Sequence, residues 1–461
     1  MIEWRPEELA AWTGGVWEGV LPSGDLRGFC HDTRRLQHGE IFVALKTARR
    51  DGHDFLPVAA QAGAGAALVE RRRADVRLPQ LVVPDPLTAL QQVAAIWRRA
   101  FPGPVVGITG SCGKTTARSI LTALLGPRCH GTFANQNNLL GVPLTLTGLD
   151  PRHHDFAAVE AGIDRPGEMA RLADMIRPSL TVITNIGDAH LDRLKTRDAI
   201  AEEKGQLGRT QRAKAVFGHA CLRYAPFRDW PGESRVLYSR EARDDGHSPT
   251  YALVQVRAPG ARRILLTTPE WGQRRFDLAS PSEGVAHTAA LCLIAASWLG
   301  VSAGEARKRL ANWRPGEKRG EIITHGRKTF YVDCYNSSPP ALRDALISFD
   351  GCAGREPRCY VLGAMKELGE ESEALHRTAV RGLTLGLLDR AICIGEEARI
   401  FADELTRRGA EPRQVDWFAQ AEEASDALRA FEGWVFLKGS RACALEQLLP
   451  REPAREGMAV C

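Results

Sequence analysis

The chain has 461 residues, of which 44% are hydrophobic and 25% charged, a composition typical of a globular protein with several domain cores. A formal charge of +5 is slight for this length, so it gives no reason to expect a nucleic-acid partner and is compatible with a small anionic substrate. The 11 cysteines include no C-x-x-C pair, which indicates neither a zinc site nor a disulfide framework. Because we find no signal-peptide core and no apolar run of membrane-spanning length, we expect a cytoplasmic protein that inserts into no membrane.

The first part of the chain is expected to fold on its own. Apolar runs at residues 41–45 and 66–69 predict strands. Two polar stretches stand out: residues 31–35 precede the first of these strands, and residues 51–55 lie between the two. Asp-Gly is a common turn, so the residues alone favour turn chemistry for these stretches, with a binding role as the alternative.

A buried strand, a glycine turn and an amphipathic helix follow one another at residues 105–125. The turn ends on Lys114 and Thr115, which is the layout of a phosphate-binding loop: the helix N-terminus faces the phosphates, the lysine adds a charge and the threonine can bind Mg²⁺. The glycine spacing differs from the standard one, and the alternative is a tight turn with a surface lysine. The candidate ATP contacts here are Thr109, Gly110, Ser111, Cys112, Gly113, Lys114, Thr115 and Thr116.

Polar residues follow two further predicted strands. Glu160 ends the strand at 156–159, and Asn185 and then His190 come after the strand at 180–184. Ligands of open α/β sheets bind beyond the carboxyl ends of the strands, so these residues are expected at the same edge as the phosphate loop. A carboxylate there is a natural Mg²⁺ ligand, whereas His190 is either a second ligand or a satisfied loop histidine.

The remainder of the chain alternates between helices and strands. Lys204 lies on a predicted helix, where a lysine is normally solvated, and residues 205–282 look peripheral. A strongly apolar helix is predicted for 287–299, and the break at 312–316 indicates a domain boundary. A smaller parallel α/β domain is expected after it, with strands at 330–332, 359–362, 391–394 and 434–437 and helices near 372–386, 396–408 and 421–430.

Several motifs recur in a fixed order: Asp32-Thr33-Arg34, Asp51-Gly52-His53, the loop from Gly110 to Thr116, Asn135 to Thr145, Glu160-Ala161-Gly162, Thr184 to Leu191, Val361 to Gly363 with Glu367 to Gly369, and Lys438 to Arg441. Together they resemble the Mur ligases of peptidoglycan synthesis over nearly the whole chain. They are most similar to the members that join D-alanyl-D-alanine to UDP-N-acetylmuramoyl-tripeptide. The resemblance implies a three-domain α/β architecture, with a uridine-nucleotide substrate domain at 1–103, a central P-loop ATP-binding domain at 104–314 and a C-terminal Rossmann-like ligase domain at 315–461.

The resemblance also implies the chemistry: ATP, with Mg²⁺, converts a substrate carboxylate into an acyl phosphate that the amine of the dipeptide attacks. The catalytic residues it implies are Lys114, Glu160, His190, Lys204 and Arg319, with the metal held by Thr115, Glu160, His190 and a carbamate on Lys204. Further ATP contacts are Asn185, His287, Arg319 and Asp333. The UDP-substrate contacts are Asp32, Thr33, Arg34, Asp51, Gly52, His53, Asn137 and Asn138.

Four positions depart from the family pattern. Thr288 and Leu291 replace asparagines of the adenine-side helix, and Ser338 and Ala364 alter two motifs of the C-terminal block. Two alternatives to the dipeptide ligase therefore stay open: a relative that joins a different amino acid or peptide, and a non-catalytic nucleotide-binding scaffold. In either ligase reading we expect a monomer.

Overall fold

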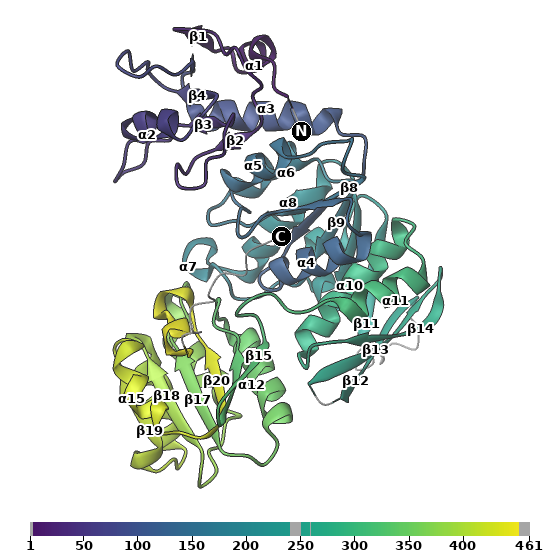
Figure 1. Ribbon diagram of the computed structural model, residues 1–461. Helices are drawn as coiled ribbons and strands as arrows, with labels where there is room; N and C mark the ends of the chain where they lie inside the picture. The colour runs from purple at the N-terminus through teal and green to yellow at the C-terminus, as the bar shows by residue number, and fades with distance from the viewer. Residues whose placement is uncertain (1–2, 240–249, 259, 451–461) are drawn as a thin grey trace, which may run out of the picture. The chain divides into compact units, whose positions relative to one another are not determined.

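The computed structural model describes residues 3–239, 250–258 and 260–450. Its contacts divide the chain into two compact units: residues 1–110, 117–184 and 201–235 form the first, and 111–116, 185–200 and 236–461 form the second. The described strands make three sheets that helices cover, which confirms the predicted α/β fold class (Figure 1). None of the described helices is long and apolar enough to cross a bilayer. The three-domain division of the chain remains a prediction.

The first sheet contains both strands predicted near the N-terminus. Its order is β1-β5-β4-β3-β2, and it is parallel except for β1, which pairs antiparallel with β5. Helix α3 begins after Asp85, whose carboxylate accepts hydrogen bonds from the Leu87 and Thr88 N–H groups, and its apolar side joins the core of this sheet. The elements are α1 (Pro6–Thr13), β1 (Val16–Glu18), β2 (Phe29–Cys30), β3 (Ile41–Val43), α2 (Leu56–Gln61), β4 (Ala66–Val69), β5 (Gln80–Val82) and α3 (Pro86–Ala100).

The second sheet has nine strands in the order β14-β13-β12-β11-β10-β9-β6-β8-β7. Strands β6 to β10 are parallel, and their central members are apolar and fully buried, as expected for a sheet covered on both faces. Its first elements are β6 (Val105–Thr109), α4 (Lys114–Leu125), β7 (Cys129–Gly131), α5 (Gly141–Thr147), β8 (Phe156–Glu160), α6 (Glu168–Ile176), β9 (Leu180–Ile183), α7 (Leu191–Leu194), α8 (Arg197–Arg209) and β10 (Lys214–Gly218).

The section that looked peripheral in sequence supplies the other half of this strand order. Strand β11 pairs parallel with β12, and β12, β13 and β14 form an antiparallel ribbon. Helix α10 begins at Glu283, four residues before the predicted start, because Ser282 Oγ accepts a hydrogen bond from the Val285 N–H and caps it. The elements are α9 (Ala225–Arg228), β11 (Ser234–Ser239), β12 (Tyr251–Ala258), β13 (Ala261–Thr268), β14 (Gly272–Leu278), α10 (Glu283–Trp298) and α11 (Ala303–Asn312).

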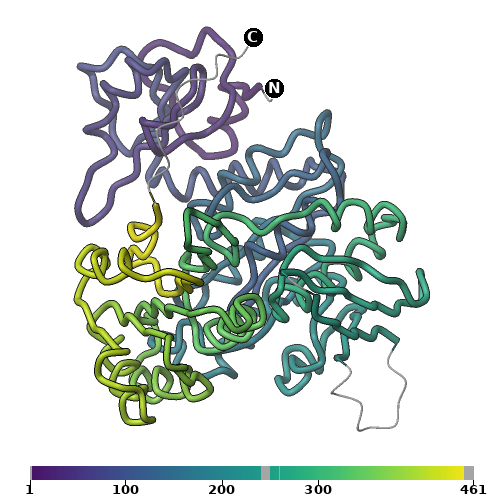
Figure 2. The backbone as a smooth tube through the Cα atoms, turned by 60° about the horizontal axis from the view of Figure 1, so that its bottom comes forward, coloured from purple at the N-terminus to yellow at the C-terminus, as the bar shows by residue number. Residues whose placement is uncertain are grey.

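The third sheet, of order β15-β16-β20-β17-β18-β19, is parallel except for the β15–β16 hairpin, and it contains all four strands predicted for the C-terminal block. Figure 2 shows the backbone of this part of the chain as a tube whose colour runs from green to yellow. The elements are β15 (Glu321–His325), β16 (Lys328–Val332), α12 (Pro339–Ala353), β17 (Arg358–Gly363), α13 (Ser372–Ala379), β18 (Arg390–Ile394), α14 (Arg399–Arg407), β19 (Val415–Phe418), α15 (Ser425–Arg429) and β20 (Gly433–Lys438). Short 3₁₀ helices of the chain include η1 (Gly52–Phe55), η2 (His219–Arg223), η4 (Gly369–Glu371), η5 (Glu396–Ala398), η6 (Pro412–Gln414), η7 (Glu422–Ala424), η8 (Arg441–Cys443) and η9 (Leu445–Leu448).

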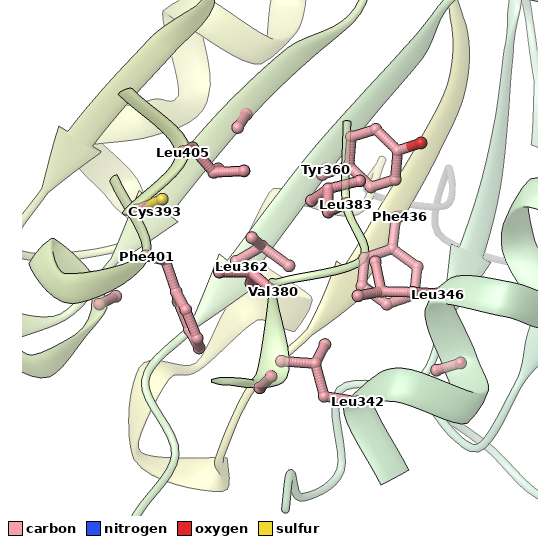
Figure 3. Close-up of a cluster of buried hydrophobic side chains, with 14 of the residues drawn as sticks. Leu342, Leu346, Tyr360, Leu362, Val380, Leu383, Cys393, Phe401, Leu405 and Phe436 are labelled. Carbon is pink, nitrogen blue, oxygen red and sulfur yellow. The ribbon is translucent and has the colours of Figure 1, made fainter. Parts of the chain in front are cut away.

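Successive residues of the third sheet point into two separate cores. Tyr360 and Leu362 belong to a cluster with side chains of α12, α13 and α14 (Figure 3), whereas Cys359 and Val361 belong to a cluster with Leu428 of α15. Side chains of a strand alternate between faces, so both faces of this sheet are covered by helices. This is the doubly wound arrangement that places binding loops at the carboxyl ends of the strands.

Candidate active site

The phosphate loop lies between β6 and α4, as predicted. Gly110 and Gly113 have φ angles of 151° and 81°, which residues with a side chain rarely adopt, so both positions require glycine. Helix α4 begins at Lys114, and the loop therefore ends at the positive pole of a 12-residue helix. A lysine and a helix N-terminus at one place favour an anion such as a phosphate.

Asn185, in the segment that follows β9, forms hydrogen bonds with this loop. Its Oδ1 accepts a hydrogen bond from the Cys112 N–H at 3.1 Å, and its Nδ2 donates to the Cys112 carbonyl at 3.2 Å. The Ser111 N–H donates to the Asn185 carbonyl at 3.1 Å, and Ser111 Oγ accepts from the Gly187 N–H at 2.8 Å. Asn185 was predicted to contact ATP, and these bonds give its side chain a role in shaping the loop.

In the first unit, Glu160 ends β8 beside β6, in register with Ile108. Its side chain is buried, and Oε1 accepts a hydrogen bond from Asn137 Nδ2 at 2.8 Å. Asn138 Oδ1 accepts from the Leu140 and Gly141 N–H groups at the start of α5. The two asparagines, predicted to contact the UDP-substrate, thus orient a predicted metal ligand and begin a helix.

Lys204 of α8 is completely buried, so its amine is not solvated. The neighbouring Glu203 is buried too, and its carboxylate accepts a hydrogen bond from the Met169 N–H of α6 at 2.9 Å. Burial of an ammonium group is costly unless it is paired or chemically altered. The burial therefore fits the carbamate that the resemblance implies for this lysine, which remains a prediction.

In the second unit, His190 precedes α7, and its Nδ1 lies 3.0 Å from Glu367 Oε2. The contact with His190 is the main cause that lowers the pKa of Glu367, and the positive charges of Arg193 and Lys114 act in the same direction. Sequence reasoning quoted Glu367 only as part of a motif and gave it no role. Its contact with a histidine far away in the sequence could not be inferred from its own surroundings.

The predicted C-terminal ATP contacts are held by interactions within the second unit. Lys438 Nζ lies 2.7 Å from Asp333 Oδ2 and also donates to the Asn336 carbonyl at 3.0 Å. The Arg319 guanidinium stacks over the Tyr335 ring at 3.9 Å from its centroid. Lys438, which is buried, belongs to the motif at 438–441 and fixes the orientation of Asp333.

Helix α10 carries His287 and two of the family departures. Burial lowers the pKa of His287 to about 4, so its ring is neutral at pH 7. Thr288 is 5% exposed and Leu291 is completely buried. Both departures therefore contribute to packing around α10.

The predicted UDP-substrate residues of the first unit form two polar turns. In the first, the Arg34 guanidinium binds Asp32 at 2.7 Å and this bond is the main cause that lowers the pKa of Asp32 to about 2; Thr33 lies between them. In the second, Asp51 caps the 3₁₀ turn that contains Gly52, by accepting from the His53 N–H.

His53 is completely buried, and both of its ring nitrogens are engaged. Nδ1 lies 2.6 Å from Asp51 Oδ1, while Nε2 accepts from the Glu70 N–H at 3.1 Å. Asp51 also binds Arg71 at 2.7 Å. This geometry supports the turn chemistry that the residues alone favoured, and any effect of His53 on a substrate would pass through the loop it holds.

The other two departures lie in loops of the C-terminal block. Ala364 directly follows β17 and is completely buried, with its N–H bonded to the Ile394 carbonyl. Ser338 precedes α12 and makes no side-chain cap bond. Next to Ala364, the Met365 N–H donates to Nε2 of the buried His376 at 3.0 Å, which fixes the backbone that leads to Glu367.

The described residues contain no group of three or more His, Cys, Asp or Glu side chains that could enclose a metal ion. The oxygen donors that the sequence singled out, the Thr115 hydroxyl and the Glu160 carboxylate, are of the kind that Mg²⁺ prefers. Mg²⁺ at nucleotide sites is commonly held by one or two protein groups, phosphates and water. Each of these two groups is therefore a suitable donor to a nucleotide-bound Mg²⁺, and the metal site itself remains a prediction.

Comparisons with known proteins agree with this geometry. The Mur ligase middle domain model matches residues 108–246, and the Mur ligase glutamate ligase domain model matches 318–441. The UDP-N-acetylmuramoyl-tripeptide--D-alanyl-D-alanine ligases of Synechocystis and Escherichia coli are 34% and 31% identical to the chain, over 79% and 94% of it and 79% and 96% of their own lengths.

Solved structures extend the likeness to the whole fold. MurF from Acinetobacter baumannii superimposes with a TM-score of 0.84 at 27% identity, covering 97% of this chain and 98% of that one. MurF from Thermotoga maritima, solved in complex with ADP, gives a TM-score of 0.76 at 26% identity, covering 92% and 96%. The chain therefore belongs to the Mur ligase family, within the group of UDP-N-acetylmuramoyl-tripeptide--D-alanyl-D-alanine ligases known as MurF.

Proposed function

We propose that this chain uses ATP to join D-alanyl-D-alanine to UDP-N-acetylmuramoyl-tripeptide, in the cytoplasmic synthesis of peptidoglycan precursors, and that it acts as a monomer. The observation that carries the proposal is the phosphate loop, with Lys114 at the start of α4 and a backbone fixed by Asn185. Membership of the MurF group supplies the substrates, and the ADP bound in the Thermotoga maritima relative supports a nucleotide at this loop.

The reaction places one anion against another, because the substrate carboxylate must attack the γ-phosphate of ATP. Lys114 holds the β- and γ-phosphates, and Arg319 steadies the transferred phosphoryl group. Thr115, Glu160, His190 and carbamylated Lys204 would hold Mg²⁺, which when bound would supply charge that offsets the repulsion. Attack of the carboxylate breaks the bond between the γ-phosphorus and the bridging oxygen, which gives an acyl phosphate and ADP. The amine of the dipeptide then attacks the carbonyl carbon of the acyl phosphate, forms the C–N bond, loses a proton and displaces inorganic phosphate.

The substrate residues are assigned by position. Asp32, Thr33 and Arg34, with the turn from Asp51 to His53 and the asparagines Asn137 and Asn138, shape the side that receives the UDP-sugar. His287 contacts the adenine, and Asp333 contacts the nucleotide together with Arg319. Binding of the UDP-substrate to full-length variants at the UDP-sugar positions, measured by calorimetry, tests the assignment of those positions.

A second candidate is the same chemistry with a different amine. Ala364, buried at the end of β17, stands where the family motif has a carboxylate, and this loop leads to the C-terminal part that handles the amine. Phosphate release measured with D-alanyl-D-alanine and with other amines, with product masses, separates the two candidates. A protein that binds ATP and releases no phosphate with any amine is a scaffold.

A further inference from the structure

Glu367 and His190 meet although both have unusual backbones. The carboxylate oxygen Oε2 lies 3.0 Å from Nδ1 of the imidazole, within the second unit. Their φ angles are 65° and 66°, in the left-handed region that non-glycine residues seldom occupy. Such conformations persist where the surrounding structure enforces them, and they concentrate at functional sites.

Two features of the structure fix the backbone around Glu367 and so maintain its contact with His190. His376 is buried, donates from Nδ1 to the Ser372 carbonyl at 2.7 Å and accepts the Met365 N–H at Nε2, so the backbone two residues before Glu367 is fixed. Two residues after it, Gly369 has a φ of 61° and lies against Asp192, so closely that an added Cβ would come within 3.2 Å of the Asp192 Cα. Glycine at 369 therefore permits the approach.

A neighbouring ion pair shows what an ordinary surface contact looks like here. Lys366 Nζ binds Glu397 at 2.5 Å, and both side chains are well exposed. In the contact of His190 with Glu367, the histidine side chain is 18% exposed and the glutamate side chain is 52% exposed. An exposed ion pair is worth little, so it would not by itself account for two left-handed residues.

We propose that Glu367 is a positioning residue whose carboxylate, 3.0 Å from Nδ1 of His190, holds the ring with its proton on Nδ1 and so leaves Nε2 as the acceptor of the ring. A histidine can bind a cation only through a nitrogen that carries no proton, and a carboxylate beside the other nitrogen orients the ring. The inference deepens the proposed function, on which it rests for the role of His190 beside the nucleotide.

The test compares the full-length Glu367→Ala and Glu367→Gln variants with Glu397→Gln, which breaks the adjacent Lys366 pair and is the matched control. Long-range ¹H–¹⁵N spectra report the tautomer of His190, assigned by its loss in His190→Gln. We expect the Nδ1–H tautomer in wild type and in Glu397→Gln, and its loss in Glu367→Ala. Mn²⁺ affinity in the presence of ADP, measured by electron paramagnetic resonance, should fall about 10- to 100-fold in both Glu367 variants and stay unchanged in the control.

Gly369→Ala provides a second route, because it pushes the segment away from Asp192 while keeping the carboxylate. It should weaken Mn²⁺ binding in the same direction as Glu367→Ala. An Nδ1–H tautomer and wild-type Mn²⁺ affinity in Glu367→Ala would overturn the inference. Failure of the proposed function would appear separately, as wild-type protein that releases no phosphate with the dipeptide while the tautomer still depends on Glu367.

Discussion

Lys114 is the residue on which ATP turnover should depend most strongly, because it is the positive side chain at the end of the phosphate loop. Lys114→Ala should lower turnover at least about 100-fold, since removal of one group that stabilises developing charge has an effect of this size. Calorimetric binding of the UDP-substrate should survive. Lys308→Ala, on an exposed part of α11, is the control. Full turnover by the Lys114 variant would show that the site is elsewhere.

Lys204 tests whether a buried amine is carbamylated. Protein equilibrated with ¹³C-bicarbonate should give a carbamate signal in ¹³C spectra, and Lys204→Met should lose it while keeping the buried volume. Ligase activity of the variant should fall about 100-fold, as expected for loss of a group that supports a metal. A signal that persists in Lys204→Met would place the carbamate on another amine.

At the residue scale, sequence reasoning found the side chains whose chemistry is visible in a local motif, such as Lys114, Thr115 and Glu160. It could not find those whose surroundings come from elsewhere in the chain. Lys204 was singled out only by the family resemblance: its local pattern is that of a solvated lysine, and its burial is seen only in the packed fold. The pairing of Glu367 with His190 joins residues that are 177 positions apart in the sequence.

At the element scale, the start of α10 depends on a carboxylate from another helix. Asp344 of α12 accepts hydrogen bonds from Ser282 Oγ at 2.5 Å and from the Glu283 N–H at 3.0 Å. Asp344→Ala should lower the free energy of unfolding by about 1 to 2 kcal/mol, because it removes a charged group from a helix N-terminus. Urea titrations measure this. Ser282→Ala added to it should cost less than its effect in wild type, and full additivity would contradict a shared cap.

Strand β7 carries a histidine that should make stability depend on pH. Burial is the main cause that lowers the pKa of His130 from 6.5 to about 4. Between these pH values the unfolded chain binds more protons than the folded one. The free energy of unfolding is therefore highest above pH 6.5 and decreases by up to roughly 3 kcal/mol as the pH is lowered toward 4. His130→Gln should flatten this part of the profile of urea midpoints, whereas the exposed His325→Gln should not. Parallel profiles for wild type and His130→Gln would contradict the expectation.

Elements with a strong apolar pattern were predicted correctly, and those without one were not. The buried strands β6, β8, β9 and β17 are continuous apolar runs, which a sequence shows directly. Strand β15 lies at the edge of its sheet and is largely exposed, so no such pattern marks it. The antiparallel ribbon β12 to β14 depends on pairing between strands, and the sequence marked this section only as peripheral.

At the scale of the whole molecule, the resemblance of many motifs in one order predicted more than any single motif could. A phosphate loop indicates nucleotide phosphates and leaves the reaction open. The assignment to the MurF group rests on the match along nearly the whole chain, and the altered loops at Ser338 and Ala364 leave the amine as the point that biochemistry must test.

The measurement that tests the central claim most directly is phosphate release by the purified full-length protein with ATP, Mg²⁺ and UDP-N-acetylmuramoyl-tripeptide, with and without D-alanyl-D-alanine. We predict release that depends on the dipeptide, together with a product whose mass is that of the UDP-N-acetylmuramoyl-pentapeptide. Absence of release with this dipeptide, in protein that binds ATP, would contradict the proposed function. Turnover with another amine would then assign the chain the same chemistry with a different substrate.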